Sequence, residues 1–124
     1  MRVFNGQKIL VVEDNFMSYK LLEAHFNRSN LEIVYASDGL QAIELFKSHP
    51  DISLILMDIQ LPGMSGLEVT KDIRKINTEV PIIAATANVF EDDKAACLEA
   101  GCTDFVTKPI NFPILFELLD KRLS

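Results

Sequence analysis

Short apolar runs alternate along this chain with stretches in which apolar residues recur every three or four positions. Each run suits a strand that is buried on both faces, because a strand with one face in water would alternate apolar and polar residues. The stretches between the runs have the spacing of amphipathic helices. The pattern therefore predicts strands within residues 9–12, 31–36, 54–58, 80–86 and 104–108. It predicts helices over about residues 15–28, 37–49, 66–76, 87–101 and 110–123.

Local signals mark several helix ends. Asn15 is a typical helix N-cap, and Gly101 suits the left-handed conformation that commonly ends a helix. Pro50 ends the second helix, because the residue before a proline disfavours the helical region. The apolar sides expected to face the sheet comprise Met17, Leu21, Leu22 and Phe26 in the first helix, Ala42, Ile43 and Phe46 in the second, Val69, Ile73 and Ile76 in the third, Ala95, Ala96 and Leu98 in the fourth, and Leu115, Leu118 and Leu119 in the fifth.

The alternation of strands and helices predicts an α/β fold, in which one parallel sheet carries helices on both faces and the crossovers are right-handed. A chain of 124 residues has the length of one domain. We expect residues 8–124 to form that domain and residues 1–7 to be an N-terminal tail or a linker. Because the predicted last helix reaches the end of this sequence, we expect no output domain here.

Charge and composition exclude several classes of protein. The net charge is −6 and the basic residues are scattered singly, which argues against a nucleic-acid surface. No run approaches the roughly 18 apolar residues of a membrane span, and residues 1–7 lack a signal-peptide core, so we expect a cytoplasmic protein without membrane insertion. Cys97 and Cys102 are spaced as in no common zinc or redox pair and are expected to be reduced packing thiols.

Polar residues stand at the ends of four predicted strands. Glu13 and Asp14 follow the first strand, and Asp58 closes the third. Thr86 closes the fourth strand and Lys108 the fifth. Ligands of open parallel sheets bind where the carboxyl ends of the strands meet. We therefore expect these five side chains to converge at one edge of the sheet.

Three converging carboxylates would repel one another strongly unless a cation or a proton neutralised them. Hard oxygen donors without a nearby His or Cys favour Mg²⁺, which binds readily through one or two carboxylates and phosphoryl oxygens. An aspartate can act as a nucleophile toward phosphorus. We therefore predict that Asp58 accepts a phosphoryl group, with Lys108 supplying positive charge and the Thr86 hydroxyl supplying a donor.

Four blocks of this sequence, Val11–Asn15, Leu56–Pro62, Ala85–Asn88 and Thr107–Pro109, resemble the signature blocks of response-regulator receiver domains. The resemblance covers essentially the whole chain. It implies a flavodoxin-like, doubly wound sheet of five parallel strands in the order 2-1-3-4-5 with five helices. The blocks at residues 85–88 and 97–101 are most similar to receivers of hybrid sensor histidine kinases, so the chain is either a stand-alone regulator or part of a longer kinase.

The same resemblance implies a role for each residue of the acidic cluster. Asp58 is the implied phosphorylation site. Asp14 and Asp58 are the implied carboxylate ligands of Mg²⁺. Glu13 completes the acid pair, and Gln60 contributes its backbone carbonyl to the metal.

The resemblance also implies a switch. Thr86 is the implied switch hydroxyl, Phe105 the switch aromatic and Lys108 the phosphate-pairing lysine, with a cis peptide bond before Pro109. Phe105 stands where the family commonly has Tyr, so its two positions differ by packing alone. Gln60 and Asn88 flank the approach of a hydrolytic water, and we predict that they set the lifetime of the phosphoryl group.

The implied function is acceptance of a phosphoryl group from a sensor histidine kinase or a histidine phosphotransfer domain, followed by a surface change that an unknown downstream effector reads. We expect no enzyme activity beyond the domain's own phosphorylation and slow dephosphorylation. The implied switching surface lies along the fourth helix, the fifth strand and the fifth helix, and includes Val89, Phe90, Phe105, Phe112 and Phe116.

Three other functions fit parts of the pattern less well. A Mg²⁺-dependent phosphatase with an aspartate nucleophile needs a second carboxylate two residues on, where this chain has Gln60. A nucleotide or flavin binder needs a glycine-rich loop after the first strand, where this chain has Glu13 and Asp14. A pseudo-receiver that only binds a partner is disfavoured because every reactive position is filled.

Overall fold

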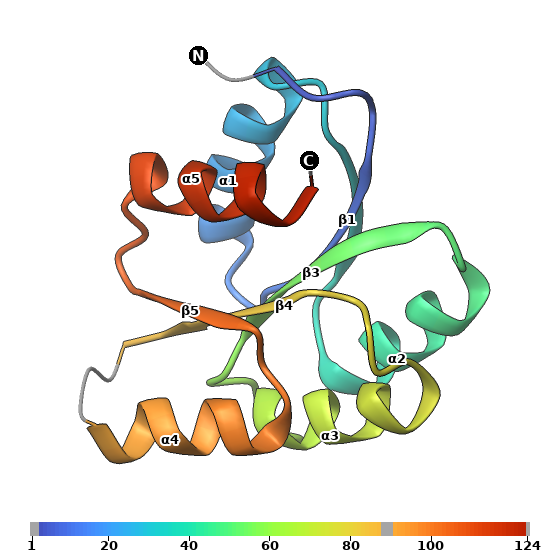
Figure 1. The fold of residues 1–124 in the computed structure, drawn as a ribbon, viewed down its shortest axis with the longest axis vertical. Helices are drawn as coiled ribbons and strands as arrows, with labels where there is room; N and C mark the ends of the chain where they lie inside the picture. Colours follow the sequence, from blue (N-terminus) through green and yellow to red (C-terminus); the bar gives the residue numbers. More distant parts are fainter. Residues whose placement is uncertain (1–2, 88–90, 124) are drawn as a thin grey trace.

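The computed structural model describes residues 3–87 and 91–123, in which five strands and five helices alternate (Figure 1). Their bounds, in chain order, are β1 (Lys8–Val12), α1 (Phe16–Arg28), β2 (Glu32–Ala36), α2 (Gly39–Ser48), β3 (Ile52–Asp58), α3 (Gly66–Ile76), β4 (Ile82–Thr86), α4 (Glu91–Ala100), β5 (Asp104–Thr107) and α5 (Phe112–Leu123). The predicted order of elements is confirmed.

The sheet has the order β2-β1-β3-β4-β5, and every neighbouring pair is parallel. Helices α1 and α5 cover one face, and α2, α3 and α4 cover the other (Figure 1). This confirms the doubly wound α/β fold. Because β1, β3, β4 and β5 run in the same direction, their carboxyl ends meet at one edge of the sheet.

Two hydrophobic cores lie on opposite faces of the sheet, and β3 contributes to both. Ile55 and Met57 belong to the core beneath α2, α3 and α4, whereas Leu54 and Leu56 belong to the core beneath α1 and α5. All four side chains are buried. Since successive side chains of a strand point to opposite faces, a segment buried on both faces must be continuously apolar, as residues 54–57 of β3 are.

Polar side chains begin three helices. The side-chain oxygens of Asn15, Asp38 and Ser65 accept backbone N–H bonds at 3.0, 2.8 and 3.3 Å from the first turns of α1, α2 and α3. At the far end of α4, Gly101 adopts φ +113°, and the Cys102 N–H donates to the Cys97 carbonyl at 3.0 Å. These bonds satisfy backbone groups that the helix itself leaves unpaired.

The expected buried side of α1 is partly wrong. Leu22 and Phe26 are buried, but Met17 is 75 % exposed and Leu21 is 54 % exposed. The helix contacts the sheet through a stripe narrower than half of its circumference, so Met17 and Leu21 fall outside that stripe. Phe16, the first residue of the helix, is also exposed at 60 %.

The expected buried sides of α3 and α4 also need correction. Ile76, in the last turn of α3, is exposed. In α4, Ala95 and Leu98 are exposed, whereas Cys97 and Ala100 are buried. A free cysteine behaves as a small apolar residue in a core, and this pair, three residues apart, is the side of α4 that faces the sheet.

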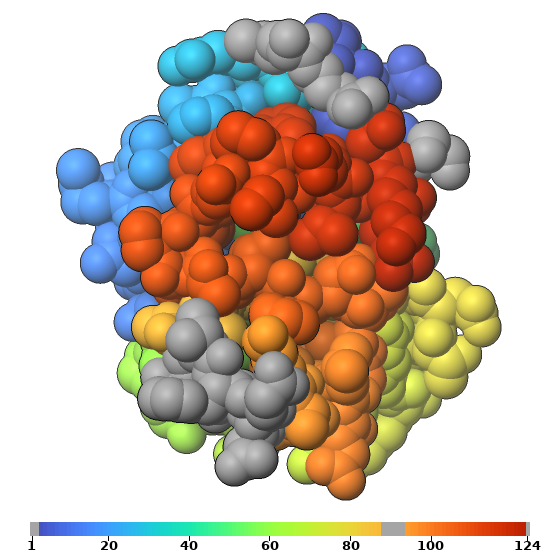
Figure 2. All heavy atoms as spheres, turned by 60° about the vertical axis from the view of Figure 1, so that its left-hand side comes forward, coloured from blue at the N-terminus to red at the C-terminus, as the bar shows by residue number. Residues whose placement is uncertain are grey.

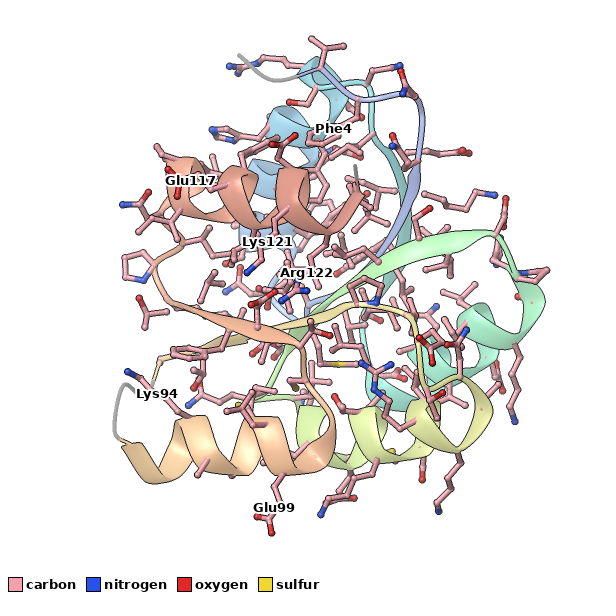
Figure 3. The ribbon with its side chains drawn as sticks, viewed as in Figure 1. Phe4, Lys94, Glu99, Glu117, Lys121 and Arg122 are labelled. Atoms are coloured by element: carbon pink, nitrogen blue, oxygen red, sulfur yellow. The ribbon has the colours of Figure 1, made fainter. Side chains whose placement is uncertain are left out.

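Residues before β1 pack against the domain. Phe4 is buried, and its ring lies 6.3 Å from that of Phe116 in α5 (Figure 3). Its N–H donates to the Ser29 carbonyl at 2.7 Å, and the Gly6 N–H donates to the Asn30 carbonyl at 2.9 Å. The assignment of residues 1–7 to a tail or a linker stays a prediction. None of the helices in the described ranges has the length and apolar character needed to span a membrane.

Candidate functional site

Three carboxylates gather at the carboxyl edge of the sheet. Asp58 closes β3, and Glu13 and Asp14 follow β1 directly. One carboxylate oxygen of each lies within 4.8 Å of those of the other two. Glu13 and Asp58 are each 3 % exposed, whereas Asp14 is exposed to solvent. The predicted convergence of these side chains is therefore present in the fold.

Lys108 connects the two buried carboxylates. Its ammonium nitrogen lies 2.9 Å from Asp58 Oδ2 and 3.2 Å from Glu13 Oε1. The Lys108 N–H donates to the Thr86 carbonyl at 2.9 Å, which extends the pairing of β4 and β5 by one residue. The peptide bond between Lys108 and Pro109 is cis.

Backbone donors hold the second oxygen of each buried carboxylate. Asp58 Oδ1 accepts the Gln60 N–H at 2.9 Å, and Glu13 Oε2 accepts the Asn15 N–H at 3.2 Å. Each carboxylate thus divides its oxygens between a nearby backbone N–H and the Lys108 ammonium. Both side chains are fixed in orientation, because they are buried and bonded at both oxygens.

The electrostatics of the cluster favour an added cation. Burial, followed by the hydrogen bond with Asp58, raises the pKa of Glu13 above its ordinary value. Burial alone would lower the pKa of Lys108, but its contacts with Asp58 and Glu13 outweigh burial and raise that pKa. One ammonium offsets one of three carboxylate charges, and hard carboxylate oxygens at this spacing suit Mg²⁺. The residues present therefore fit the expected ion.

Thr86 and Phe105 lie on β4 and β5, the next two strands of the sheet beyond β3. Asp58 is opposite Ala85 in the pairing of β3 with β4, so Thr86 is the next residue along, and its side chain is buried. Phe105 of β5 is half-buried, and Lys94 of α4 lies over its ring, 5.1 Å from the centroid (Figure 3).

The implied switching surface is formed by α4, β5 and α5, which come forward in Figure 2. Phe116 is half-buried and packs against the core, where its ring lies beside those of Phe4 and Phe26. Phe112 stacks on His25 of α1 at 3.7 Å. These two aromatic side chains therefore join α5 to its neighbours. Asn88, Val89 and Phe90 lie outside the described residues.

Two residues important to the site carried no recognisable signal in the sequence. The Tyr35 hydroxyl of β2 donates to the Glu13 carbonyl at 2.8 Å, although a tyrosine in a strand is ordinary. Gly66 begins α3 against the end of β3, where a Cβ atom would lie 2.3 Å from the Asp58 carbonyl oxygen. The sequence predicts only that a helix begins near Gly66, because the close approach of this glycine to Asp58 depends on the folded chain.

Comparisons with known proteins identify the family. Residues 9–120 match the model of the response regulator receiver domain. Hybrid signal transduction histidine kinase I of Dictyostelium discoideum is 42 % identical over 125 residues, which cover 94 % of this chain and 7 % of the kinase. The polar-differentiation response regulator DivK of Brucella anthropi is 38 % identical over 121 residues, which cover 95 % of this chain and 97 % of DivK. The chain belongs to the response regulator receiver domain family of two-component and phosphorelay signalling.

Solved structures agree with this assignment. One similar structure is the complex of the Saccharomyces cerevisiae histidine phosphotransfer protein Ypd1 with the receiver domain of its downstream response regulator Ssk1. A chain of that complex superposes with a TM-score of 0.90 at 31 % identity, and the match covers 98 % of this chain and 91 % of that chain. The receiver domain of the Pseudomonas aeruginosa sensor histidine kinase PA1611, solved with a magnesium ion in its active-site cleft, superposes with a TM-score of 0.87 at 35 % identity, covering 95 % of this chain and 98 % of that chain.

Proposed function

We propose that Asp58 of this receiver domain accepts a phosphoryl group from a phosphohistidine on a sensor histidine kinase or a histidine phosphotransfer domain. The observation that carries the proposal is the contact of 2.9 Å between the buried Asp58 carboxylate and Lys108, within a cluster of three carboxylates. Bond formation between an Asp58 oxygen and phosphorus accompanies cleavage of the bond between phosphorus and the imidazole nitrogen of the donor. The released imidazole recovers a proton from solvent when its nitrogen requires one.

Lys108 and Thr86 serve the transferred group in this proposal. The Lys108 ammonium, which pairs with Asp58 before transfer, stays beside the phosphoryl oxygens and balances their charge. The buried Thr86 hydroxyl is one residue beyond the strand position opposite Asp58 and acts as a hydrogen-bond donor to the modified side chain. Neither residue forms a covalent bond.

Mg²⁺ is the proposed cofactor, held by the Glu13, Asp14 and Asp58 cluster together with the Gln60 backbone carbonyl. The magnesium ion in the PA1611 receiver domain supports this choice, as do the closely spaced hard oxygens of this chain. When bound, the ion neutralises carboxylate and phosphoryl charge during transfer. The chain's own residues provide its cage and keep Asp58 oriented through the Gln60 N–H.

The phosphodonor is proposed to dock across the start of α1. Phe16, Met17 and Leu21 leave an apolar patch exposed there, although most large apolar side chains of the domain are buried. A cavity of about 170 Å³ adjoins the patch and is lined by Glu13, Ser18, Leu21, Leu22, Lys108, Pro109, Ile110 and Phe112. Because Glu13 and Lys108 also belong to the acidic site, a partner on this patch is close to Asp58. The Ypd1 and Ssk1 complex is a precedent for the class of partner.

Phosphotransfer kinetics test this proposal. We expect a phosphorylated histidine phosphotransfer domain to label the wild-type chain and to leave Asp58→Asn unlabelled. Leu21→Ser should slow transfer from that domain by about tenfold, a typical loss for an interface anchor, without slowing labelling by a small phosphodonor. Leu40→Ser is the matched control, because Leu40 is 69 % exposed on α2, across the sheet. Equal slowing in both leucine variants would remove α1 as the docking surface.

Phosphorylation of Asp58 is proposed to change the surface formed by α4, β5 and α5. The new charge draws Thr86 toward the phosphoryl group and shifts the packing of Phe105, whose ring lies beneath Lys94. Gln60 and Asn88 are proposed to set the phosphoryl lifetime. Substituting both Gln60 and Asn88 by other residues should change the rate of dephosphorylation, and an unchanged rate would contradict this part of the proposal.

A further inference from the structure

We propose that Tyr35 is a positioning residue for Mg²⁺, because its hydroxyl fixes the main chain that carries Glu13 and Asp14. This inference rests on the proposed metal site. Tyr35 is in β2, at the edge of the sheet, and contributes no ligand to the ion. Its hydroxyl reaches the Glu13 carbonyl at 2.8 Å.

The main chain of Glu13 lies beyond the end of β1 and is bonded on both sides by β2. The Glu13 N–H donates to the Ala36 carbonyl at 3.0 Å, which continues the ladder between the two strands. Because β2 ends at Ala36, the strand ladder does not continue to the Glu13 carbonyl. The Tyr35 hydroxyl replaces it by donating to the Glu13 carbonyl, immediately before the peptide that leads to Asp14.

A second aromatic ring holds Tyr35 in this orientation. The Tyr19 ring of α1 stacks on Tyr35 with centroids 3.8 Å apart and an angle of 17° between the planes. The stack is made by the Tyr19 ring, whereas the Tyr19 hydroxyl donates to Glu23 Oε2 at 3.0 Å on the same helix. The stack restricts the Tyr35 side chain, so little entropy is lost when its hydroxyl donates to Glu13.

The expected consequence is preorganisation of the metal cage. Asp14 is exposed, and its carboxylate is useful to the ion only when the chain after Glu13 keeps it near Asp58. Without the Tyr35 hydroxyl, this segment adopts other positions in the metal-free protein. Apparent affinity then falls in proportion to the fraction of molecules in which the cage is assembled. A lost hydrogen bond of ordinary strength corresponds to a Kd for Mg²⁺ raised by about two- to fivefold.

Tyr35→Phe and Tyr19→Phe are a matched pair, because each removes one hydroxyl and keeps its ring. Calorimetric titration with Mg²⁺ should give the raised Kd in Tyr35→Phe and the wild-type Kd in Tyr19→Phe. Amide hydrogen exchange without metal should quicken at residues 13–15 in Tyr35→Phe alone. Phosphorylation by a small donor at saturating Mg²⁺ should match wild type, since Asp58 and Lys108 are unchanged.

Two results would overturn the inference. Wild-type Kd in Tyr35→Phe, even with a lowered free energy of unfolding, would show that the hydroxyl serves stability alone. An equal rise of Kd in Tyr19→Phe would show that the hydroxyl bond to Glu13 is not the cause. If the wild-type chain bound no Mg²⁺, both the metal site and this inference would fail, whereas equal binding by wild type and Tyr35→Phe leaves the metal site standing.

Discussion

Gly66→Ala should disturb both the stability of the domain and its phosphorylation. Gly66 begins α3 and packs against the main chain at the end of β3. An added Cβ would lie 2.3 Å from the Asp58 carbonyl oxygen and 2.7 Å from Ile59 Cα. Both neighbours are backbone atoms, so no side chain can rotate to relieve the contact.

The size of the effect follows from these distances. Atoms not bonded to each other are best separated by about 3.5 Å, so α3 and the end of β3 must move apart by about 1 Å. Overpacking of this kind costs about 1–3 kcal/mol of unfolding free energy, partly offset by up to about 1 kcal/mol from the helix propensity of alanine. The same displacement moves Asp58 relative to Lys108, whose ammonium is 2.9 Å away.

Urea denaturation and phosphorylation kinetics measure the two effects. We expect a net loss of about 1–2 kcal/mol in unfolding free energy for Gly66→Ala and a slower reaction with a small phosphodonor. Gly39→Ala is the matched control, because its Cβ would meet Val69 Cγ2 at 2.6 Å, a side-chain contact that does not involve the main chain at Asp58. It should phosphorylate at the wild-type rate. Wild-type stability and kinetics in Gly66→Ala would refute the reasoning.

Two further predictions concern stability. Because burial, and then the hydrogen bond with Asp58, raises the pKa of Glu13, the folded metal-free protein binds this proton more tightly than the unfolded chain. Its unfolding free energy should fall as pH rises from about the ordinary Glu pKa of 4.5 through the raised value. Glu13→Gln should remove this decline, and urea midpoints that fall equally in both proteins would contradict the assignment. Arg74→Met should cost about 2 kcal/mol by urea denaturation, since Arg74 donates to the Gly101 carbonyl at 2.9 Å and to Thr103 Oγ1 at 3.4 Å. Lys71→Met, on the exposed side of the same helix, should change little, and a loss there as large as that of Arg74→Met would rule out the hydrogen bonds as the cause.

The fold was predictable because strand ends and helix ends carry local signals. The continuously apolar residues 54–57 of β3 require burial on both faces, Asn15 begins α1 by capping it, and Gly101 ends α4 by its left-handed conformation. The convergence of Glu13, Asp58 and Lys108 follows from parallel strands alone. The fourth strand was predicted within residues 80–86, with Pro81 at its start, and β4 begins one residue after this proline, at Ile82. A proline has no N–H for the ladder.

Helix orientation and long-range contacts were not predictable in the same way. Hydrophobic spacing defines an apolar half of α1, but the contact with the sheet decides that Leu22 is buried and Leu21 is exposed. The Tyr35 bond to Glu13 joins residues 22 positions apart and depends on the pairing of β1 with β2. Three large apolar residues of α1, Phe16, Met17 and Leu21, are exposed and have no role in the core, which is the pattern expected of a surface that binds a partner.

Intact mass after incubation with Mg²⁺ and a small phosphodonor tests the central claim most directly. We expect one phosphate-sized increment that requires Mg²⁺, is lost in Asp58→Asn, and is retained in Asp51→Asn, where the substituted carboxylate is exposed and lies outside the cluster. If the acyl phosphate hydrolyses before its mass can be measured, beryllofluoride is the alternative reagent, and it should shift the amide resonances of residues 58–60. An increment that persists in Asp58→Asn, or the absence of any response to both reagents, would contradict the assignment of Asp58 as the phosphoacceptor.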